Sequence, residues 1–326
     1  MTDVTDVHPG TEALLAAVPA LAPYARRATL LRPAAGTPSA RDSHVGGPML
    51  WPAEEEWPVC RGPHLTEVRE KLSDADREAL RRIDRDMRAR RAGKPHSAYE
   101  LTEEEAELHS RIMNGAGSLD MNTWELCRWV PVPADPGVPL VGVLQLRAQD
   151  VPAADLPEGP DVLQVLWCPR EHPELPGRSA HWGPAVEVYR RSAASVAAVL
   201  EPPVPVDAPR RHLPRPCVLD PAGVTDLPDP EDLPAELAAR ADAWAQAHGT
   251  EYHRGLACHD GWKAGGWPSW HSTDPEPLDC SCGARTRLSL TLDSGRDPDL
   301  NLGSFGELRI FTCPEDPSHP LLLNLQ

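Results

Sequence analysis

Cysteine and histidine residues towards the C-terminal end of this chain have the types and order of a zinc site. A Cys-x-Cys comes first, and further along a Cys-Pro is followed by a histidine six residues after its cysteine. A structural zinc site needs four nitrogen or sulfur ligands arranged as a tetrahedron, although Cys-x-Cys is tighter than the usual spacing. We predict that zinc, if bound, is held by Cys280, Cys282, Cys313 and His319.

A second set of the same residue types lies in the N-terminal half, where a histidine again follows a Cys-Pro. Its members are Cys60, His64, Cys168 and His172. Both sets have an alternative interpretation, in which the thiols are vestigial ligands that pack as small apolar side chains. The remaining cysteines have no such partners and are predicted to lie in the core; they are Cys127, Cys217 and Cys258.

Glycine pairs followed by tryptophan mark a candidate ligand-binding surface. Aromatic rings beside glycines could stack on a peptide or another flat ligand. They could equally cap the hydrophobic core, which is the commoner place for tryptophan. The residues concerned are Trp51, Gly265, Gly266, Trp267 and Trp270.

Known catalytic motifs do not occur in the sequence. It contains no P-loop, dinucleotide fingerprint, G-x-S-x-G or H-E-x-x-H. Cys258-His259-Asp260 has the residue types for thiol catalysis, but neighbours in sequence rarely form a nucleophile–base pair. Three histidines near Asp274 fit no metal motif; they are His253, His259 and His271. We predict no catalytic residue.

The charge balance limits the classes of partner. Thirty-two basic against 49 acidic residues give a formal net charge of −17, which repels nucleic acid and anionic lipid. A protein or peptide partner, basic if charge guides binding, fits better. The chain has no run of 18 apolar residues, and its start, MTDVTDVHPG, lacks the features of a signal peptide. We therefore expect a cytoplasmic protein.

Hydrophobic periodicity predicts a mixture of helices and short strands. A helical pattern over 65–91 is followed by Thr102 with Glu105, a capping box that starts a second helix reaching about Met113. These two helices predict a hairpin. Further helices are predicted over 11–27, with a break at Pro19, and over 231–249. Alternating or apolar runs predict strands over 139–150, 162–168, 185–189, 287–293 and 307–312, and a packed segment over 321–325.

The two halves of the chain carry the same landmarks in the same order. Gly46-Gly47 corresponds to Gly265-Gly266, and a tryptophan lies four residues after the second glycine in each copy. Ordered correspondences of this kind indicate duplication. The first copy is longer by about the length of 61–135, so the helical hairpin is an insertion. The matched pairs are Trp51 with Trp270, Cys60 with Cys280, Leu163 with Leu308, Val165 with Ile310, and Cys168 with Cys313.

The predicted fold is mainly β (α+β), with two pseudo-symmetric β-rich repeats, a helical hairpin inserted in the first and a helix between the halves. The halves would comprise residues 1–200 and 231–326, joined by a proline-rich connection over 201–230, and would form one compact globular unit.

Several motifs resemble those of the YwqG-like family of bacterial proteins of unknown function. They are GGPMLWP, WPVC and PLVGVLQL in the first copy, and GWKAGGWPSW, CSCG and GELRIFTCP in the second. The motif order is distantly similar to the programmed cell death protein 2 group, whose members escort a ribosomal protein. This resemblance implies a mainly β fold with internal pseudo-symmetry and protein binding more than catalysis. It supplies no catalytic residue.

Three functional hypotheses follow. The first is a non-catalytic protein- or peptide-binding module, zinc-stabilised and chaperone- or immunity-like, with a partner segment added to a sheet edge or laid across the Gly-Gly/Trp surface. The second is a metal-dependent enzyme with its site in the cleft between the repeats. In the third, the repeats only carry the helical hairpin, which is the functional part.

Overall fold

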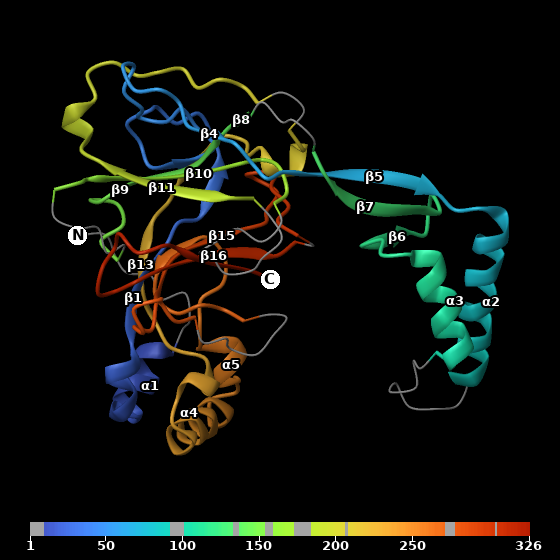
Figure 1. Cartoon of the computed structure of the whole chain (residues 1–326). Coiled ribbons are helices and arrows are strands. Elements are labelled where there is room, and N and C mark those ends of the chain that lie inside the picture. The colour runs from blue at the N-terminus through green and yellow to red at the C-terminus, as the bar shows by residue number, and fades with distance from the viewer. Residues whose placement is uncertain are drawn as a thin grey trace. The chain divides into compact units, whose positions relative to one another are not determined.

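The chain forms two compact units in a computed structural model, Met1–Gly62 with Pro136–Gln326 and Pro63–Asp135. We call the first the core unit and the second the insertion. The structure describes residues 10–91, 101–132, 137–153, 159–172, 184–205, 208–270, 278–303 and 305–326. Antiparallel sheets dominate, which confirms the predicted mainly β, α+β class (Figure 1).

Sheet A contains the C-terminal strands, in which small and aliphatic side chains alternate with polar ones. Every pairing in it is antiparallel. Its order is β13 (Ala222–Asp226), β1 (Arg26–Leu30), β14 (Lys263–Gly265), β15 (Arg287–Asp293), β16 (Glu307–Thr312) and β17 (Leu322–Leu325).

Sheet B has the same number of strands and the same plan. Its order is β11 (Val186–Arg191), β10 (Val162–Trp167), β9 (Val141–Arg147), β3 (His44–Val45), β12 (Cys217–Leu219) and β2 (Pro33–Ala35). The strands predicted over 139–150, 162–168 and 185–189 are therefore present as β9, β10 and β11. A separate short pair joins β4 (Val59–Cys60) to β8 (Val138–Pro139).

The two sheets are related by an exchange of strands between the halves of the chain. Strands β3, β9, β10 and β11 of sheet B follow the same order as β14, β15, β16 and β17 of sheet A. Next to β14, however, lies the N-terminal β1, and next to β3 lies β12, from the segment between the halves. Sheet A thus takes β1 from the N-terminal half, and sheet B takes β12 from the chain that follows that half. The segment predicted as a connection over 201–230 contains β12 and β13.

A shared hydrophobic core joins the two sheets. It is built from one face of each, with Val45, Leu144 and Val165 from sheet B and Leu290 and Ile310 from sheet A among its buried members. Because strand side chains alternate between faces, the neighbouring residues on each strand point away from this core. Those outward positions carry the polar side chains described below.

Helices α1 (Thr11–Ala17), α4 (Ala235–Ala247) and α5 (Tyr252–Gly255) pack in a second apolar cluster with the 3₁₀ turn η1 (Pro19–Tyr24). They lie at the same end of the core unit (Figure 1). Pro19 ends α1, as the sequence predicts, because proline cannot supply the next helical hydrogen bond. Further 3₁₀ turns are η2 (Ala193–Ser195), η3 (Arg210–His212) and η4 (Pro230–Asp232).

The insertion contains a sheet that sequence periodicity did not predict. The helix expected from Leu65 is wrong for its first turns, because Leu65–Lys71 is strand β5, paired with β7 (Glu125–Pro131). Helix α2 (Asp74–Arg91) starts only after Ser73, whose Oγ accepts the Asp76 N–H. Helix α3 (Glu103–Met113) has the predicted Thr102–Glu105 capping box. The third strand is β6 (Ser118–Asp120).

Candidate functional site

The four C-terminal candidate ligands lie together. Their ligand atoms are all within 4.8 Å of one another. Cys280 Sγ lies 3.3 Å from His319 Nδ1, and Cys282 Sγ lies 3.6 Å from Cys313 Sγ. The Cys-x-Cys forms a tight turn before β15, closed by the Gly283 N–H on the Cys280 carbonyl. Cys313 directly follows β16, so the strand pair brings both cysteine groups to one end of sheet A.

The N-terminal set is also assembled. The ligand atoms of Cys60, His64, Cys168 and His172 are all within 4.8 Å of one another. Cys60 Sγ lies 3.8 Å from His172 Nε2. Cys60 ends β4 and Cys168 follows β10, the strand that corresponds to β16 in sheet A. Both sets occupy equivalent places after the corresponding strands.

The distances suit tetrahedral coordination. Ligands at zinc distances of 2.0–2.3 Å stand about 3.3 to 3.8 Å apart along the edges of a tetrahedron. The sulfur–nitrogen distances of 3.3 and 3.8 Å and the sulfur–sulfur distance of 3.6 Å agree with those edges. Two cysteines with two histidines, and three cysteines with one histidine, are both donor sets of structural zinc. The residues present therefore fit the metal, and they could hold one ion in each cluster.

The two clusters differ in exposure and in thiol acidity. In the C-terminal cluster Cys282 is exposed, whereas Cys168, His64 and His172 of the N-terminal cluster are buried. Burial raises the pKa of Cys313, but backbone N–H groups and His319 outweigh it and lower that pKa to about 6. The pKa of Cys168 is raised, first by its contact with the Cys60 thiol and then by burial. Thiolate, the form that binds metal, is thus favoured at Cys313.

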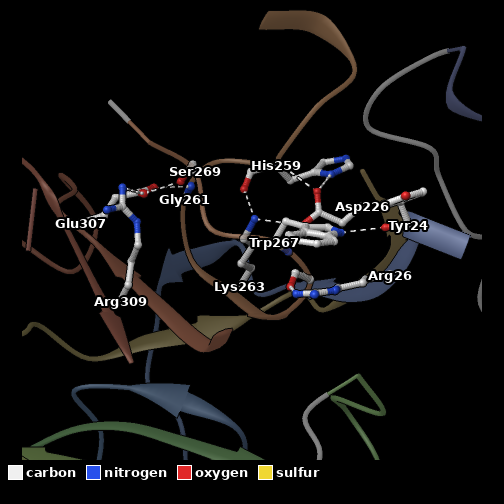
Figure 2. Close-up of polar contacts among 11 residues, drawn as sticks. Tyr24, Arg26, Asp226, His259, Gly261, Lys263, Trp267, Ser269, Glu307 and Arg309 are labelled. Carbon is white, nitrogen blue, oxygen red and sulfur yellow. Dashed lines mark hydrogen bonds and ion pairs between the residues drawn. The ribbon is translucent and has the colours of Figure 1, made fainter. Parts of the chain in front are cut away.

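A buried carboxylate, Asp226, binds the backbone of Trp267 directly after the second glycine pair (Figure 2). Asp226 Oδ2 accepts the Trp267 N–H at 2.7 Å, and a Cβ on Gly266 would lie only 2.3 Å from that oxygen. Gly266 also has a φ of +79°, which disfavours other residues. The glycine is therefore required by the turn, whatever the turn binds.

Trp267 and Trp270 contact arginines within the fold. The Trp267 indole N–H donates to the Tyr24 carbonyl, and the Arg26 guanidinium lies 3.3 Å from its ring centroid. Trp270 has Arg309 at 5.1 Å from its ring centroid. Trp51 is 1% exposed. Trp51 is therefore part of the core, whereas Trp267 and Trp270 are half-buried against arginine side chains of the fold.

Asp226 is the centre of a buried ionic cluster. Its carboxylate lies 3.1 Å from Lys263 Nζ and 3.0 Å from His259 Nδ1. Burial alone raises the pKa of Asp226, but Lys263, His259 and the Trp267 N–H lower it to about 2. A second buried ion pair, Glu307 with Arg309, is also drawn in Figure 2. Asp226 and Lys263 are completely buried, so this cluster organises the turn and is closed to a substrate.

The enzyme candidates from the sequence do not assemble into a catalytic arrangement in the described residues. Burial raises the pKa of Cys258 well above its usual value, which disfavours a nucleophilic thiolate. His253 pairs with Asp229 and His259 with Asp226. His271 and Asp274 lie outside the described residues. Sequence reasoning missed Asp226 and Arg309; for Arg309 the available sign was a charged side chain between the apolar Leu308 and Ile310.

Comparison with known proteins adds no family. No protein-family model matches the chain, and a search of curated proteins found no match either. The resemblance to YwqG-like proteins therefore rests on its motifs alone. None of the helices in the described ranges is long and apolar enough to cross a membrane.

Proposed function

We propose that this chain is a zinc-stabilised, non-catalytic module that binds a protein or peptide, in a chaperone- or immunity-like role. The observation that carries the proposal is the pair of four-residue Cys/His clusters at equivalent places in the two repeats. Four protein ligands complete a zinc tetrahedron and leave no position for a substrate, which is the mark of a structural site. The same motifs that resemble the YwqG-like family support this class.

The clusters connect segments that lie at the ends of different strands. In the C-terminal copy, metal would tie the turn before β15 to the end of β16 and to His319, which precedes β17. In the N-terminal copy it would tie the end of β4 to the end of β10. Zinc of this kind contributes directly to folding free energy. A binding module gains from this stabilisation because its loops are held in place before a partner arrives.

Metal content tests the structural part of the proposal. Protein purified without added metal should hold about two zinc ions per chain, one for each complete ligand set. Cys168→Ser and Cys313→Ser should each remove about one ion, since each breaks one set. Cys217→Ser, at a buried cysteine outside both clusters, is the matched control and should keep both. Wild-type protein with no zinc would contradict the proposal.

Chelation should distinguish the two clusters. The C-terminal cluster includes the exposed Cys282, whereas Cys168, His64 and His172 are buried. We therefore expect a chelator to remove zinc in two phases, the faster from the C-terminal cluster. The measurement is zinc release followed by a colorimetric dye, with Cys313→Ser lacking the fast phase. A fast phase that survives in this variant would overturn the assignment.

Partner binding tests the other part. The metal-loaded chain, immobilised and exposed to lysate of its native cell, should retain a specific protein. An excess of soluble chain should prevent this protein from binding to the immobilised chain. Turnover of a small-molecule substrate that depends on the bound zinc would instead favour the enzyme hypothesis. The zinc and partner experiments are independent, so one can fail without the other.

A further inference from the structure

We propose that a groove on the core unit, lined by residues 53–57 and by Leu200, Glu201 and Pro203, binds an extended basic segment of a partner protein. This proposal rests on the proposed binding function and names the surface and the chemistry of the partner. The groove has a volume of about 430 Å³. It lies in the first repeat, next to Trp51, the counterpart of Trp270.

Two segments far apart in sequence build the groove. Pro52 and Val199 form an antiparallel bridge. On either side of it, the Ala53 N–H donates to the Ala198 carbonyl at 2.9 Å and the Leu200 N–H donates to the Trp51 carbonyl at 2.8 Å. The main chains of the two walls are therefore fixed to each other, and the groove exists before any partner binds.

Apolar side chains line the groove. Trp57 is 8% exposed, and its indole N–H already donates to the Leu140 carbonyl at 2.8 Å. The Trp57 ring packs against Trp51 with centroids 5.0 Å apart, which fixes its position. Leu200 and Pro203 also line the groove. Val204, directly after Pro203, is 84% exposed. A partner can bury an apolar side chain here.

Exposed carboxylates surround this apolar lining. They are Glu54, Glu55, Glu56 and Glu201. Glu55 is neutralised by Arg191, whose two terminal nitrogens lie 2.9 and 3.2 Å from its oxygens. In the described part of the chain the other three carboxylates form no ion pair. The groove thus presents an apolar surface beside three uncompensated negative charges.

Charge complementarity selects the occupant. Lysine or arginine on either side of an apolar residue would place its cations at the carboxylates and its apolar side chain against Trp57. A second copy of this chain is disfavoured, because each carries a formal charge of −17. Acidic segments and anionic ligands are excluded for the same reason. The partner segment is therefore basic, with an apolar residue at its centre.

The test is the affinity of the metal-loaded full-length chain for a fluorescein-labelled peptide, Lys-Arg-Leu-Lys-Arg, measured by anisotropy. The triple variant E54Q/E56Q/E201Q removes the three free charges at the groove. The matched control E12Q/E236Q/D297N removes three exposed acids elsewhere on the core unit. We expect the groove variant to bind about tenfold more weakly, as loss of three exposed charge contacts implies, and the control to change by less than about twofold.

A second peptide separates apolar recognition from general attraction. Lys-Arg-Ser-Lys-Arg keeps the charges, loses the apolar centre and should bind more weakly than the leucine peptide to wild-type protein. Equal weakening by both triple variants, equal affinity for both peptides, or no binding to the wild type would each overturn the groove proposal. Zinc content and capture of a native partner do not depend on this groove. A failed groove test would therefore leave the proposed function standing.

Discussion

The two repeats place a buried polar row at the same position of their sheets but fill it with different chemistry. In sheet B the row is His44, Gln145 and Gln164, which are register partners across β3, β9 and β10. In sheet A the corresponding row is Lys263, Thr291 and Arg309. All six side chains are fully buried. One backbone plan therefore accepts either neutral amides or charged groups on the face away from the shared core.

The polar atoms of the neutral row form hydrogen bonds with one another and with the loop of residues 40–50. Gln145 Oε1 accepts the Leu50 N–H and the Gln164 amide, both at 2.8 Å. The Gln145 amide nitrogen donates to the carbonyls of Ala40 and Asp42. His44 accepts the Gly47 N–H and donates to the Pro48 carbonyl. Amides can both donate and accept, so no charge needs compensation in this row.

The charged row depends on carboxylates from outside it. Lys263 needs Asp226 of β13, and Arg309 needs Glu307. Even so, Thr291 Oγ1 and Arg309 Nε are buried and find no hydrogen-bond partner in the part of the chain that the structure describes. A buried ion pair is fragile in one respect, because removal of one partner leaves the other charge uncompensated. We therefore expect the second repeat to be the more sensitive to single substitutions.

Loss of Asp226 should have the largest effect. Asp226→Ala leaves Lys263 buried and unpaired and removes the acceptor of the Trp267 and His259 N–H groups, at a cost of about 3 to 5 kcal/mol. Urea unfolding measures the change. The double variant D226L/K263M should recover part of this loss, because it removes both charges; no recovery would contradict the ionic explanation.

The next largest effect is expected from acid, which should destabilise the two rows at different pH values. Burial lowers the pKa of His44 to about 4, below its usual value of 6.5, so the unfolded chain binds the proton more readily. Stability from neutral His44 is complete above pH 6.5 and falls towards pH 4, by about 3 kcal/mol in all. The pKa of Asp226 is about 2, so the charged row weakens only below about pH 4.

The measurement is unfolding free energy against pH for wild type and His44→Gln. The glutamine variant has no titrating group at this position, so its profile should be flatter between pH 6.5 and pH 4. Parallel profiles would show that His44 is not held neutral by the fold.

Gln145→Leu should have a smaller effect than Asp226→Ala. It leaves the Leu50 N–H and the Gln164 amide without their shared acceptor, at a cost of about 1 to 3 kcal/mol. Thermal unfolding measures it. If Gln145→Leu destabilises more than Asp226→Ala, the contrast between neutral and charged rows is wrong.

Thr291→Val should have the smallest effect, and it should be favourable. It replaces a buried hydroxyl, which has no partner within the described ranges, with a methyl group of similar shape, so stability should rise by up to about 1 kcal/mol. The comparison is Thr29→Val on β1 of the same sheet, whose hydroxyl is also buried and has no hydrogen-bond partner among the described residues. Destabilisation by both would indicate that ordered water satisfies these hydroxyls.

Short-range patterns in the sequence predicted much of this molecule. The repeated Gly-Gly, tryptophan and Cys-Pro landmarks indicated the duplication, and the histidine that follows each Cys-Pro pointed to both Cys/His sets, whose ligand atoms the structure brings together. Those features depend on residues that recur in order along one chain. The alternation over 287–293 and 307–312 likewise predicted β15 and β16.

Long-range pairings were not predictable in this way. Leu65–Lys71 has a helix-compatible pattern and becomes β5 only because β7 is available to pair with it. The exchange of β1 and β12 between sheets leaves no local trace in either strand. Asp226 was missed because its importance depends on Lys263, 37 positions away. In each case tertiary contact overrides or creates what the local sequence specifies.

X-ray absorption at the zinc edge tests the central claim, two closed structural metal sites, most directly. The clusters contain five cysteines and three histidines, so the account predicts four-coordinate zinc with an average of about 2.5 sulfur and 1.5 nitrogen ligands. Cys313→Ser, which breaks the cysteine-rich cluster, should leave a spectrum of about two sulfurs and two nitrogens. A water ligand, a five-coordinate shell or the absence of sulfur scattering in the wild-type protein would contradict it.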